Sequence, residues 1–229
     1  MNSKYEDFDE LKVLFEIEGE LVAETPIRIS SGRDQAKFDL VDNPVLRIKR
    51  FKNGQLVSEP YIPGSSLKGV FRATCELIGK SLLQSGKLSN SNIDELLNGI
   101  FGSQELAGHV ICFDAYPADN VPVETFIKPG IRINRTLGSV HYQGLFMEEF
   151  IAPGTVFRFR MMIINIDLDN ENDDRSKILN KLIKTLKDHG LQIGGRKTIG
   201  AGLVRLRRGV IRRCVLQDGE LKEVSRKEL

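Results

Sequence analysis

Apolar and polar residues alternate near the start of the chain, which predicts a long strand or a bent pair of strands over residues 11–30. The spacing then changes to that of an amphipathic helix, because Leu67, Phe71 and Cys75 recur on one face between Ser66 and about Gln84. The same patterns predict a helix over 93–100, strands over 109–116 and 155–166, a helix that Asp173 or Asp174 caps and Gly190 closes, and a last strand or pair of strands over 201–216.

The order strand, helix, strand, strand, helix, strand is that of an α+β fold with a ferredoxin-like or RRM-like βαββαβ core. We expect a single domain over 1–229, with core segments at about 11–30, 63–116 and 155–216. Two insertions, at about 31–62 and 117–154, interrupt this core. Asn53-Gly54 predicts a tight turn between residues 44–52 and 55–62, whereas 117–129 is expected to be loop and 130–150 is less regular.

Composition narrows the class of protein. The chain has 229 residues with 41% hydrophobic content, which is ample for a core, and a formal net charge of only +2. A nucleic-acid surface would therefore have to come from local patches. Three widely spaced cysteines without a CxxC pair argue for a reducing compartment and against a cysteine zinc site. No apolar run approaches the roughly 20 residues of a membrane span, so we expect a cytoplasmic protein without membrane contact.

The segment Tyr61 to Arg72 reads as a loop that opens directly into a helix. Ser65 or Ser66 is expected to cap this helix, and the remaining free N–H groups would form an anion site. Lys68 and Arg72 lie four residues apart and would add two cations beside it. The alternative is an ordinary amphipathic helix with a solvated basic face; the spacing is not that of a P-loop.

A second basic segment is rich in glycine and runs from Gly194 to Gly202, with Arg196 and Lys197 within it. Gly194 and Gly195 would let the backbone approach a ligand closely. Residues 190–217 carry seven cations and no acid, which suits contact with a phosphate backbone. The alternative is a turn before an edge strand whose charges keep that edge soluble.

The residues Ile62-Pro-Gly-Ser-Ser-Leu-Lys-Gly69 resemble the signature of the RAMP superfamily, in particular the backbone subunit of type III CRISPR effector complexes (the Csm and Cmr families). The glycine-rich segment is similar to the loop before the last strand of that family, although Ala201 stands where members often have an aromatic residue. The resemblance implies that copies stack head to tail along a guide RNA. It assigns the guide phosphates to Ser65, Ser66, Lys68, Arg72, Gly194, Gly195, Arg196 and Lys197.

The segment Asp42-Asn-Pro-Val-Leu46 resembles the one that carries the aspartate required for target RNA cleavage in the Csm-type subunit. The resemblance implies that Asp42 is catalytic in the attack of a ribose 2′-hydroxyl on its adjacent phosphate. The carboxylate would accept the hydroxyl proton or hold a weakly bound Mg or Mn ion, with Asp34 and Asp39 near enough in sequence to assist. The alternative is a structural turn at Asp42-Asn43 before Pro44.

Residues 130–150 match the place of the family's thumb hairpin, which wedges into the guide–target duplex. Arg132 and Arg135 would bind phosphates, and His141, Tyr142 or Phe146 would stack on a displaced base. The alternative is a surface loop whose aromatic residues pack on their own domain.

We therefore expect a CRISPR RNA-binding backbone subunit that meets target RNA and other effector subunits and cuts the target with Asp42. Three alternatives stay open: a scaffold without cleavage, a guide-processing endoribonuclease that uses His141, and a small-molecule phosphate enzyme that uses the Gly194–Gly202 loop. The last lacks any Walker or Rossmann context.

Overall fold

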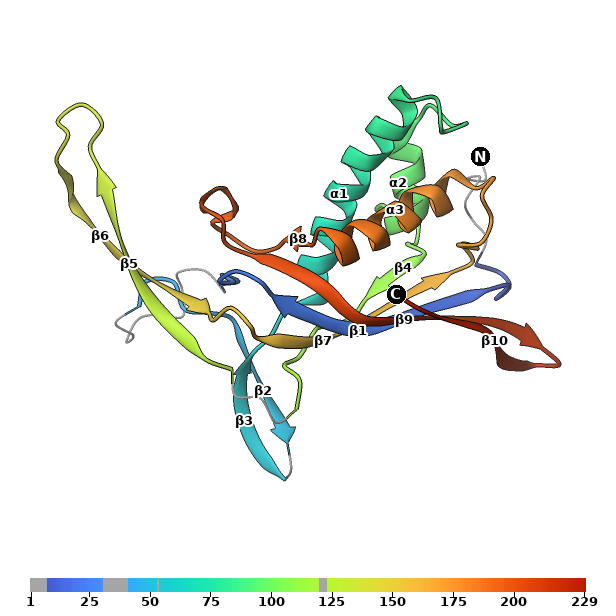
Figure 1. Cartoon of the computed structure of the whole chain (residues 1–229), viewed down its shortest axis with the longest axis horizontal. Helices are drawn as coiled ribbons and strands as arrows, with labels where there is room; N and C mark the ends of the chain where they lie inside the picture. Colours follow the sequence, from blue (N-terminus) through green and yellow to red (C-terminus); the bar gives the residue numbers. More distant parts are fainter. Residues whose placement is uncertain (1–7, 31–40, 53, 120–122) are drawn as a thin grey trace.

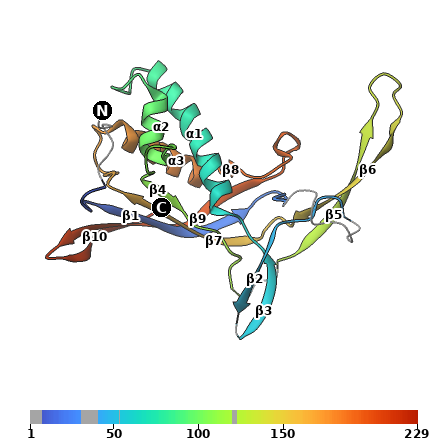
Figure 2. The same ribbon diagram turned by 180° about the vertical axis from the view of Figure 1, so that it is seen from behind.

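The computed structural model describes residues 8–30, 41–52, 54–119 and 123–229. In these residues an antiparallel sheet carries helices on one face and leaves the other face open (Figures 1 and 2). The sheet is built from β1 (Leu14–Ala23), β4 (Val110–Cys112), β7 (Val156–Ile164), β9 (Leu203–Gln217) and β10 (Glu220–Glu228), in the spatial order β10-β9-β1-β7-β4, with the short β8 (Leu191–Gln192) paired to β9.

Without the added edge strand β10, the spatial order of the strands is fourth, first, third, second along the chain, and each of these neighbouring pairs is antiparallel. This is the ferredoxin-like arrangement, so the predicted fold class is confirmed. The alternation seen in the sequence explains the two faces of β1. Phe15 and Ile17 are buried toward the helices, while Glu16 and Glu18 lie on the open face and pair with arginines of β7 and β9.

The helices are α1 (Gly64–Gln84), α2 (Ile93–Phe101) and α3 (Asp174–Asp188). Leu67, Phe71 and Cys75 of α1 are fully buried, and the ring of Phe71 meets Phe159 of β7 edge to face. The predicted cap of α3 is confirmed, because the Asp173 side chain accepts a hydrogen bond from the Arg175 N–H.

Two hairpins project from this body (Figure 1). The first, β2 (Arg47–Lys52) with β3 (Gln55–Pro60), confirms the hairpin predicted around Gly54. The second is the thumb hairpin, β5 (Thr125–Ile133) with β6 (Val140–Ile151). The prediction of loop over 117–129 was wrong from residue 125 onward, where β5 begins. Residues 130–150, expected to be less regular, lie largely in these two strands, and the register of their pairing shifts between Ile131 and Ile133.

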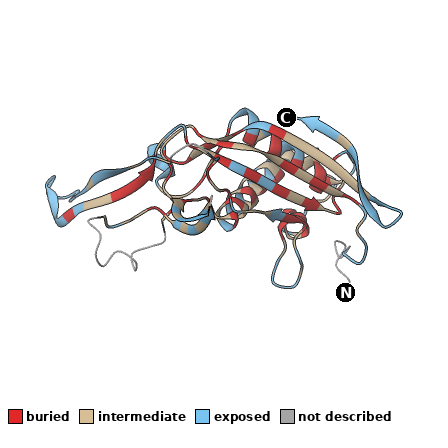
Figure 3. Ribbon diagram, turned by 90° about the horizontal axis from the view of Figure 1, so that it is seen from below, coloured by how far each residue is buried: buried red, intermediate tan, exposed pale blue. Residues whose placement is uncertain are grey.

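Buried residues concentrate in the sheet and helices, whereas exposed residues dominate the outer part of the thumb hairpin and the β9–β10 end (Figure 3). The β10 strand was not predicted. It pairs with β9 over the last residues of the chain, and its sequence of charged residues carries no apolar alternation. None of the described helices combines the length and apolar character needed to cross a membrane.

Candidate nucleic-acid interface

The start of α1 differs from the expected anion site. The helix begins at Gly64 with Pro63 as its N-cap residue, so neither Ser65 nor Ser66 caps it. The Gly64 N–H donates to the Asp114 carboxylate at 2.7 Å, which places an acid of the chain itself at this positive helix end. Ser65 is exposed and Lys68 is half-buried beside the Cys112 thiol, whose pKa burial raises to about 12.

Arg72 holds α2 in place. Its guanidinium donates to the carbonyl oxygens of Leu97 and Gly102 and to the Asn98 side chain, at 3.4, 3.0 and 2.7 Å. These groups lie at the C-terminal end of α2, where carbonyls lack helical partners and a cation complements the dipole. The described contacts of Arg72 are therefore structural, and its contact with phosphate stays a prediction.

The glycine-rich loop uses its backbone freedom mainly within the chain. Gly194 has φ +72°, and a Cβ there would lie 2.2 Å from the Arg28 carbonyl oxygen. The Gly195 N–H donates to that same oxygen at 2.8 Å. Gly194 and Gly195 therefore fix the loop against residue 28, which corrects the expectation that they approach a ligand. The loop instead presents the exposed side chains of Arg196 and Lys197.

The carboxylate of Asp42 is exposed and anchored to the thumb hairpin. One of its oxygens, Oδ2, accepts a 2.7 Å hydrogen bond from the Met147 backbone N–H. The neighbouring Asn43 pairs in parallel with Glu148, so this segment runs along the free edge of β6. The expected turn at Asp42 is thus a strand-edge contact that fixes where its carboxylate stands.

Three of the segments singled out in the sequence meet in one pocket of about 170 Å³. Asp42 comes from the segment before β2, Arg132 from the end of β5, and Arg196 from the glycine-rich loop. The remaining lining residues are Asn43, Gln143, Leu145, Phe146 and Glu148. One exposed carboxylate and two arginines around a polar hollow match the charge pattern of a phosphate diester with a nearby proton acceptor.

Glu148 of the thumb hairpin connects this side of the pocket to the glycine-rich loop on the other side. It is 5% exposed, and its two oxygens pair with Arg28 at 3.0 Å and with Arg196 at 2.8 Å. A buried carboxylate needs such partners, and this one fixes the glycine-rich loop to the thumb hairpin. The guanidinium of Arg196 also lies over the Phe146 ring at 5.1 Å.

Glu149 makes the matching connection on the other face of β6. It forms an ion pair with Arg47 and accepts a 2.9 Å hydrogen bond from the Val45 N–H. Burial opposes the charge of this carboxyl, but the hydrogen bonds from Arg47, Thr125 and Val45 outweigh it and lower its pKa to about 2. The base of the thumb hairpin is therefore clamped on both faces by buried acids.

On the outer part of the thumb hairpin, the side chains that were predicted to contact RNA are exposed to solvent. Arg135, His141 and Tyr142 are all exposed, and Tyr142 is 85% exposed. The Nδ1 atom of His141 lies 2.8 Å from the Tyr142 carbonyl oxygen. Of the thumb residues predicted from the sequence, Arg132 and Phe146 line the pocket with Asp42, whereas Arg135, His141 and Tyr142 do not.

The described residues do not by themselves fit a metal ion near Asp42. They contain no group of three or more His, Cys, Asp or Glu side chains placed to hold one. Glu148 is committed to two arginines, which leaves Asp42 as the single uncommitted carboxylate of the pocket among these residues. Asp34 and Asp39, named from the sequence as helpers, lie outside the described residues.

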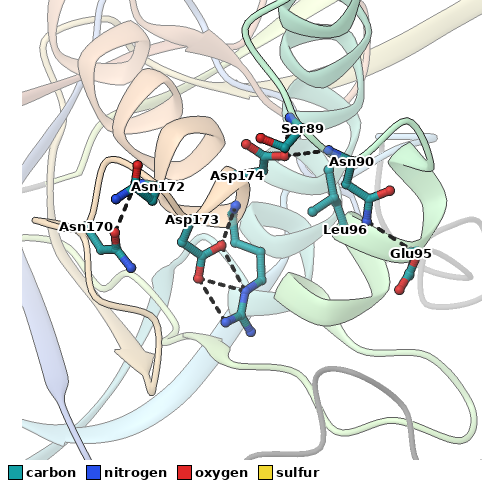
Figure 4. A pocket seen from close by; sticks show the side chains of 9 residues that line it. Ser89, Asn90, Glu95, Leu96, Asn170, Asn172, Asp173 and Asp174 are labelled. Atoms are coloured by element: carbon teal, nitrogen blue, oxygen red, sulfur yellow. Dashed lines mark hydrogen bonds and ion pairs between the residues drawn. The ribbon is translucent and has the colours of Figure 1, made fainter.

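A larger hollow of about 580 Å³ lies between α2 and the start of α3 (Figure 4). Its acids already have structural partners. Asp173 caps α3, and Asp174 accepts from the N–H groups of Ser89 and Asn90 at 2.7 Å and pairs with Lys177. This hollow therefore ties the loop after α1 to α3, and we assign it no chemistry.

Glu148 and Gln143, which complete the Asp42 pocket, were not predicted from the sequence, and Phe146 was predicted only as a residue that could stack on a displaced base. A glutamate inside an apolar strand was the available signal for Glu148, because such a residue is rarely buried without a cationic partner. Among the described residues, none of the segment 64–68 lines this pocket.

Comparison with known proteins identified relatives that match most of the chain. The chain is 24% identical to the CRISPR system Cms endoribonuclease Csm3 of Methanothermobacter thermautotrophicus, over 86% of this chain and 84% of that protein. It is 27% identical to the protein of the same description from Methanocaldococcus jannaschii, over 83% and 77%. Its fold is similar to a chain of the type III-B Cmr-beta structure in the apo state, with a TM-score of 0.58, 15% identity and coverage of 84% and 96%.

The model of one family, the RAMP superfamily, matches residues 20–205. That match extends from within β1 to within β9 and takes in the three helices, the strands β4, β7 and β8, and the β2–β3 and thumb hairpins, while β10 lies outside it. The Asp42 pocket, the thumb hairpin and the glycine-rich loop all lie inside it. This chain therefore belongs to the RAMP superfamily.

Proposed function

We propose that this chain is a backbone subunit of a type III CRISPR effector complex that binds CRISPR RNA, meets target RNA and works with other effector subunits. The names of its relatives support this proposal, because two of them are Csm3 endoribonucleases that match most of the chain. Support also comes from the fold, which is similar to a chain of a type III-B Cmr-beta complex bound to cognate target RNA, with a TM-score of 0.55 and 20% identity.

The observation that carries the proposal is the convergence of Asp42, Arg132 and Arg196 on one pocket. They come from three separate segments, and Glu148 and the Met147 N–H hold two of them in place. Phosphate contacts of this kind fix the register of a nucleic acid without reading its sequence. Base pairing between guide and target would then supply the specificity.

In the proposed reaction, Asp42 removes the proton from a ribose 2′-hydroxyl of the target. The 2′-oxygen bonds to the adjacent phosphorus while the bond from phosphorus to the 5′-oxygen breaks. The products are a 2′,3′-cyclic phosphate and a 5′-hydroxyl, whose proton comes from water. Arg132 and Arg196 would neutralise the charge that develops on the phosphate oxygens. A requirement for Mg or Mn stays a prediction, and no step here depends on it.

Copies of the chain are proposed to associate head to tail. The thumb hairpin and the β9–β10 hairpin lie at opposite ends of the molecule (Figure 1), and a contact between unlike ends does not close on itself. Such a contact builds an open row of subunits, each of which would place one Asp42 pocket along the same RNA.

The residues that line the Asp42 pocket distinguish this proposal from two alternatives. A scaffold without cleavage would keep the arginine contacts but give no cut at Asp42. A guide-processing enzyme based on His141 is less favoured, because that side chain lies on the exposed part of the thumb hairpin and outside the Asp42 pocket.

The proposal is tested by loading the chain with a guide RNA and its partner subunits and probing the guide with a nuclease. We expect protected stretches that repeat at regular spacing, and Arg132→Glu should abolish them because it reverses an exposed charge in the pocket. Lys184→Glu, which reverses an exposed charge of α3 away from both ends of the molecule, serves as the control. Equal protection by Arg132→Glu and wild type would contradict the placement of RNA at this pocket.

A further inference from the structure

The ring of Phe146 lies where the thumb hairpin meets the glycine-rich loop, and the proposed reaction gives it no task. Phe146 is half-buried on β6 and pairs with Gly130 of β5. A Cβ at position 130 would lie 2.3 Å from two atoms of the ring, so the ring fills the space that a side chain of β5 would need. Glycine at position 130 therefore provides the seat for this ring.

The guanidinium of Arg196 lies over the seated ring, with its carbon atom 5.1 Å from the ring centroid. A cation in this position is attracted by the electrons of the ring face. The Nε atom of Arg196 also donates to the Glu148 carboxylate at 2.8 Å. Phe146 and Glu148 are two residues apart on β6 and so lie on the same face of the hairpin. Two neighbouring side chains of the thumb hairpin thus hold one side chain of the loop.

These contacts leave part of the guanidinium available to a ligand. The hydrogen bond to Glu148 uses Nε, and within the part of the chain that the structure describes Arg196 makes none through Nη1 or Nη2. The two Nη groups form a parallel pair of donors that matches two oxygens of a phosphate. The Arg196 side chain is 38% exposed and lines the pocket that contains Asp42. The held guanidinium can therefore offer this pair of donors to a phosphate in the pocket.

The backbone of Arg196 adds to this placement. Its φ of +63° is left-handed, a conformation that is unfavourable for a residue with a Cβ. Its carbonyl oxygen accepts from the N–H groups of Ile199 and Ala201 at 3.2 and 3.3 Å, which closes the loop on this residue. A strained backbone of this kind persists only where the surrounding structure fixes it. The loop therefore keeps Arg196 in a conformation in which its side chain meets Phe146 and Glu148.

We propose that Phe146, seated on Gly130, is a positioning residue that holds the Arg196 guanidinium in place for the phosphate that is cleaved. The inference rests on the proposed function, in which Arg196 neutralises the charge that develops on the phosphate oxygens. A guanidinium that is fixed in advance does not have to reorganise when this charge appears. Its placement should therefore affect the rate of cleavage more than the affinity for RNA.

The first test measures single-turnover cleavage of guide-complementary RNA by the guide-loaded assembly, together with RNA affinity. Phe146→Leu keeps apolar bulk but removes the ring, and it should lower the rate by about fivefold or more, the factor that corresponds to a cation–π contact. RNA affinity should stay close to that of wild type. Phe146→Tyr keeps the ring and should restore most of the rate. In an Arg196→Ala background, Phe146→Leu should lower the rate no further, because the guanidinium that it positions is gone.

The seat is tested by the residue opposite the ring. Gly130→Ala should lower the cleavage rate, because the added methyl group would displace the ring. In a Phe146→Ala background the same change meets no ring and should cause no further loss. Multiplied losses from Gly130→Ala and Phe146→Ala would show that Gly130 does not act through the ring.

A second readout needs no RNA. The NMR resonance of the Arg196 Nε–H group, assigned by its loss in Arg196→Lys, should be shifted by the ring current in wild type and in Phe146→Tyr but not in Phe146→Leu. An unchanged resonance in Phe146→Leu would overturn the proposal. Multiplied rate losses from Phe146→Leu and Arg196→Ala, or a loss of RNA affinity at an unchanged rate, would overturn it too, and the latter would place the ring on the RNA. Wild-type assemblies that bind RNA without cutting would contradict the proposed cleavage, and the resonance alone would then decide whether the ring holds the guanidinium.

Discussion

The backbone N–H of Met147 donates a 2.7 Å hydrogen bond to the carboxylate of Asp42, across 105 positions of the sequence. This contact fixes an exposed acid at the edge of β6, next to Arg132 and Arg196. Because Oδ2 accepts this bond, the described contacts leave Oδ1 available to a ligand. This hydrogen bond therefore attaches the proposed catalytic carboxylate to the thumb hairpin.

Loss of the Arg132 side chain should weaken binding of RNA of any base sequence. Its side chain is exposed in the pocket, so Arg132→Ala should remove about one phosphate contact and reduce the slope of log affinity against log salt by about 0.7 for single-stranded RNA. The measurement is a salt titration of binding with Lys184→Ala as control. An unchanged slope in Arg132→Ala would show that Arg132 contacts no phosphate.

Arg72→Ala should act on stability instead. The change would leave the Leu97 and Gly102 carbonyls and the Asn98 side chain without their common partner, at a cost of about 1–3 kcal/mol in the free energy of unfolding. Denaturant unfolding measures this loss, and Arg72→Lys should restore only part of it because one ammonium replaces a fork of donors. A normal unfolding midpoint together with a reduced salt slope would return Arg72 to the RNA surface.

Because the pKa of Glu149 is lowered in the folded chain, we expect the chain to lose stability in acid. Its pKa in the folded chain is about 2, below the ordinary value of 4.5, so the native state favours the charged form. The resulting stabilisation is present above pH 4.5 and declines as the pH falls toward 2. Melting temperature should therefore drop more steeply across this window in wild type than in Glu149→Gln. Parallel curves for the two proteins would show that Glu149 does not clamp the thumb hairpin.

Two glycines of the same loop form a matched pair for a backbone test. Gly194 and Gly200 both have positive φ, but a Cβ would meet the Arg28 carbonyl oxygen at 2.2 Å only at Gly194, while Gly200 has open space. Gly200→Ala should cost about 1–2 kcal/mol of stability from backbone strain, and Gly194→Ala should cost more. Equal losses in chemical denaturation would mean that the contact with Arg28 does not constrain the loop.

Much of the fold was predictable from apolar spacing, because most of its strands and helices bury one face. Phe15 and Ile17 alternate with glutamates in β1, and Leu67 and Phe71 have helical spacing in α1. The strands β5 and β10 lack this signal. Most of β5 is exposed or half-buried and contains Pro129-Gly130, which reads as a turn, and β10 is charged along most of its length.

Several residues of the candidate site could be predicted from the sequence, but the contacts that hold them together could not. Asp42, Arg132 and Arg196 were all named from the sequence, through a resemblance to known segments. Spacing along the chain does not reveal that Glu148 joins Arg28 to Arg196, since such a buried pair forms only when three distant segments fold together. The contacts that Arg72 makes within the chain were unpredictable for the same reason, because its acceptors lie at the end of α2.

The most direct measurement is cleavage of guide-complementary RNA by the guide-loaded assembly, with wild type, Asp42→Ala and Asp42→Asn compared in the presence of Mg or Mn and of a chelator. Asparagine keeps an oxygen that accepts from the Met147 N–H but cannot take a proton. If Asp42 is the catalytic residue, wild type should make regularly spaced cuts, neither variant should cut, and both variants should bind RNA as tightly as wild type does. Loss of the cuts with chelator would add a metal requirement. Normal cleavage by Asp42→Asn, or RNA-bound assemblies of wild type that never cut, would contradict the catalytic role of Asp42.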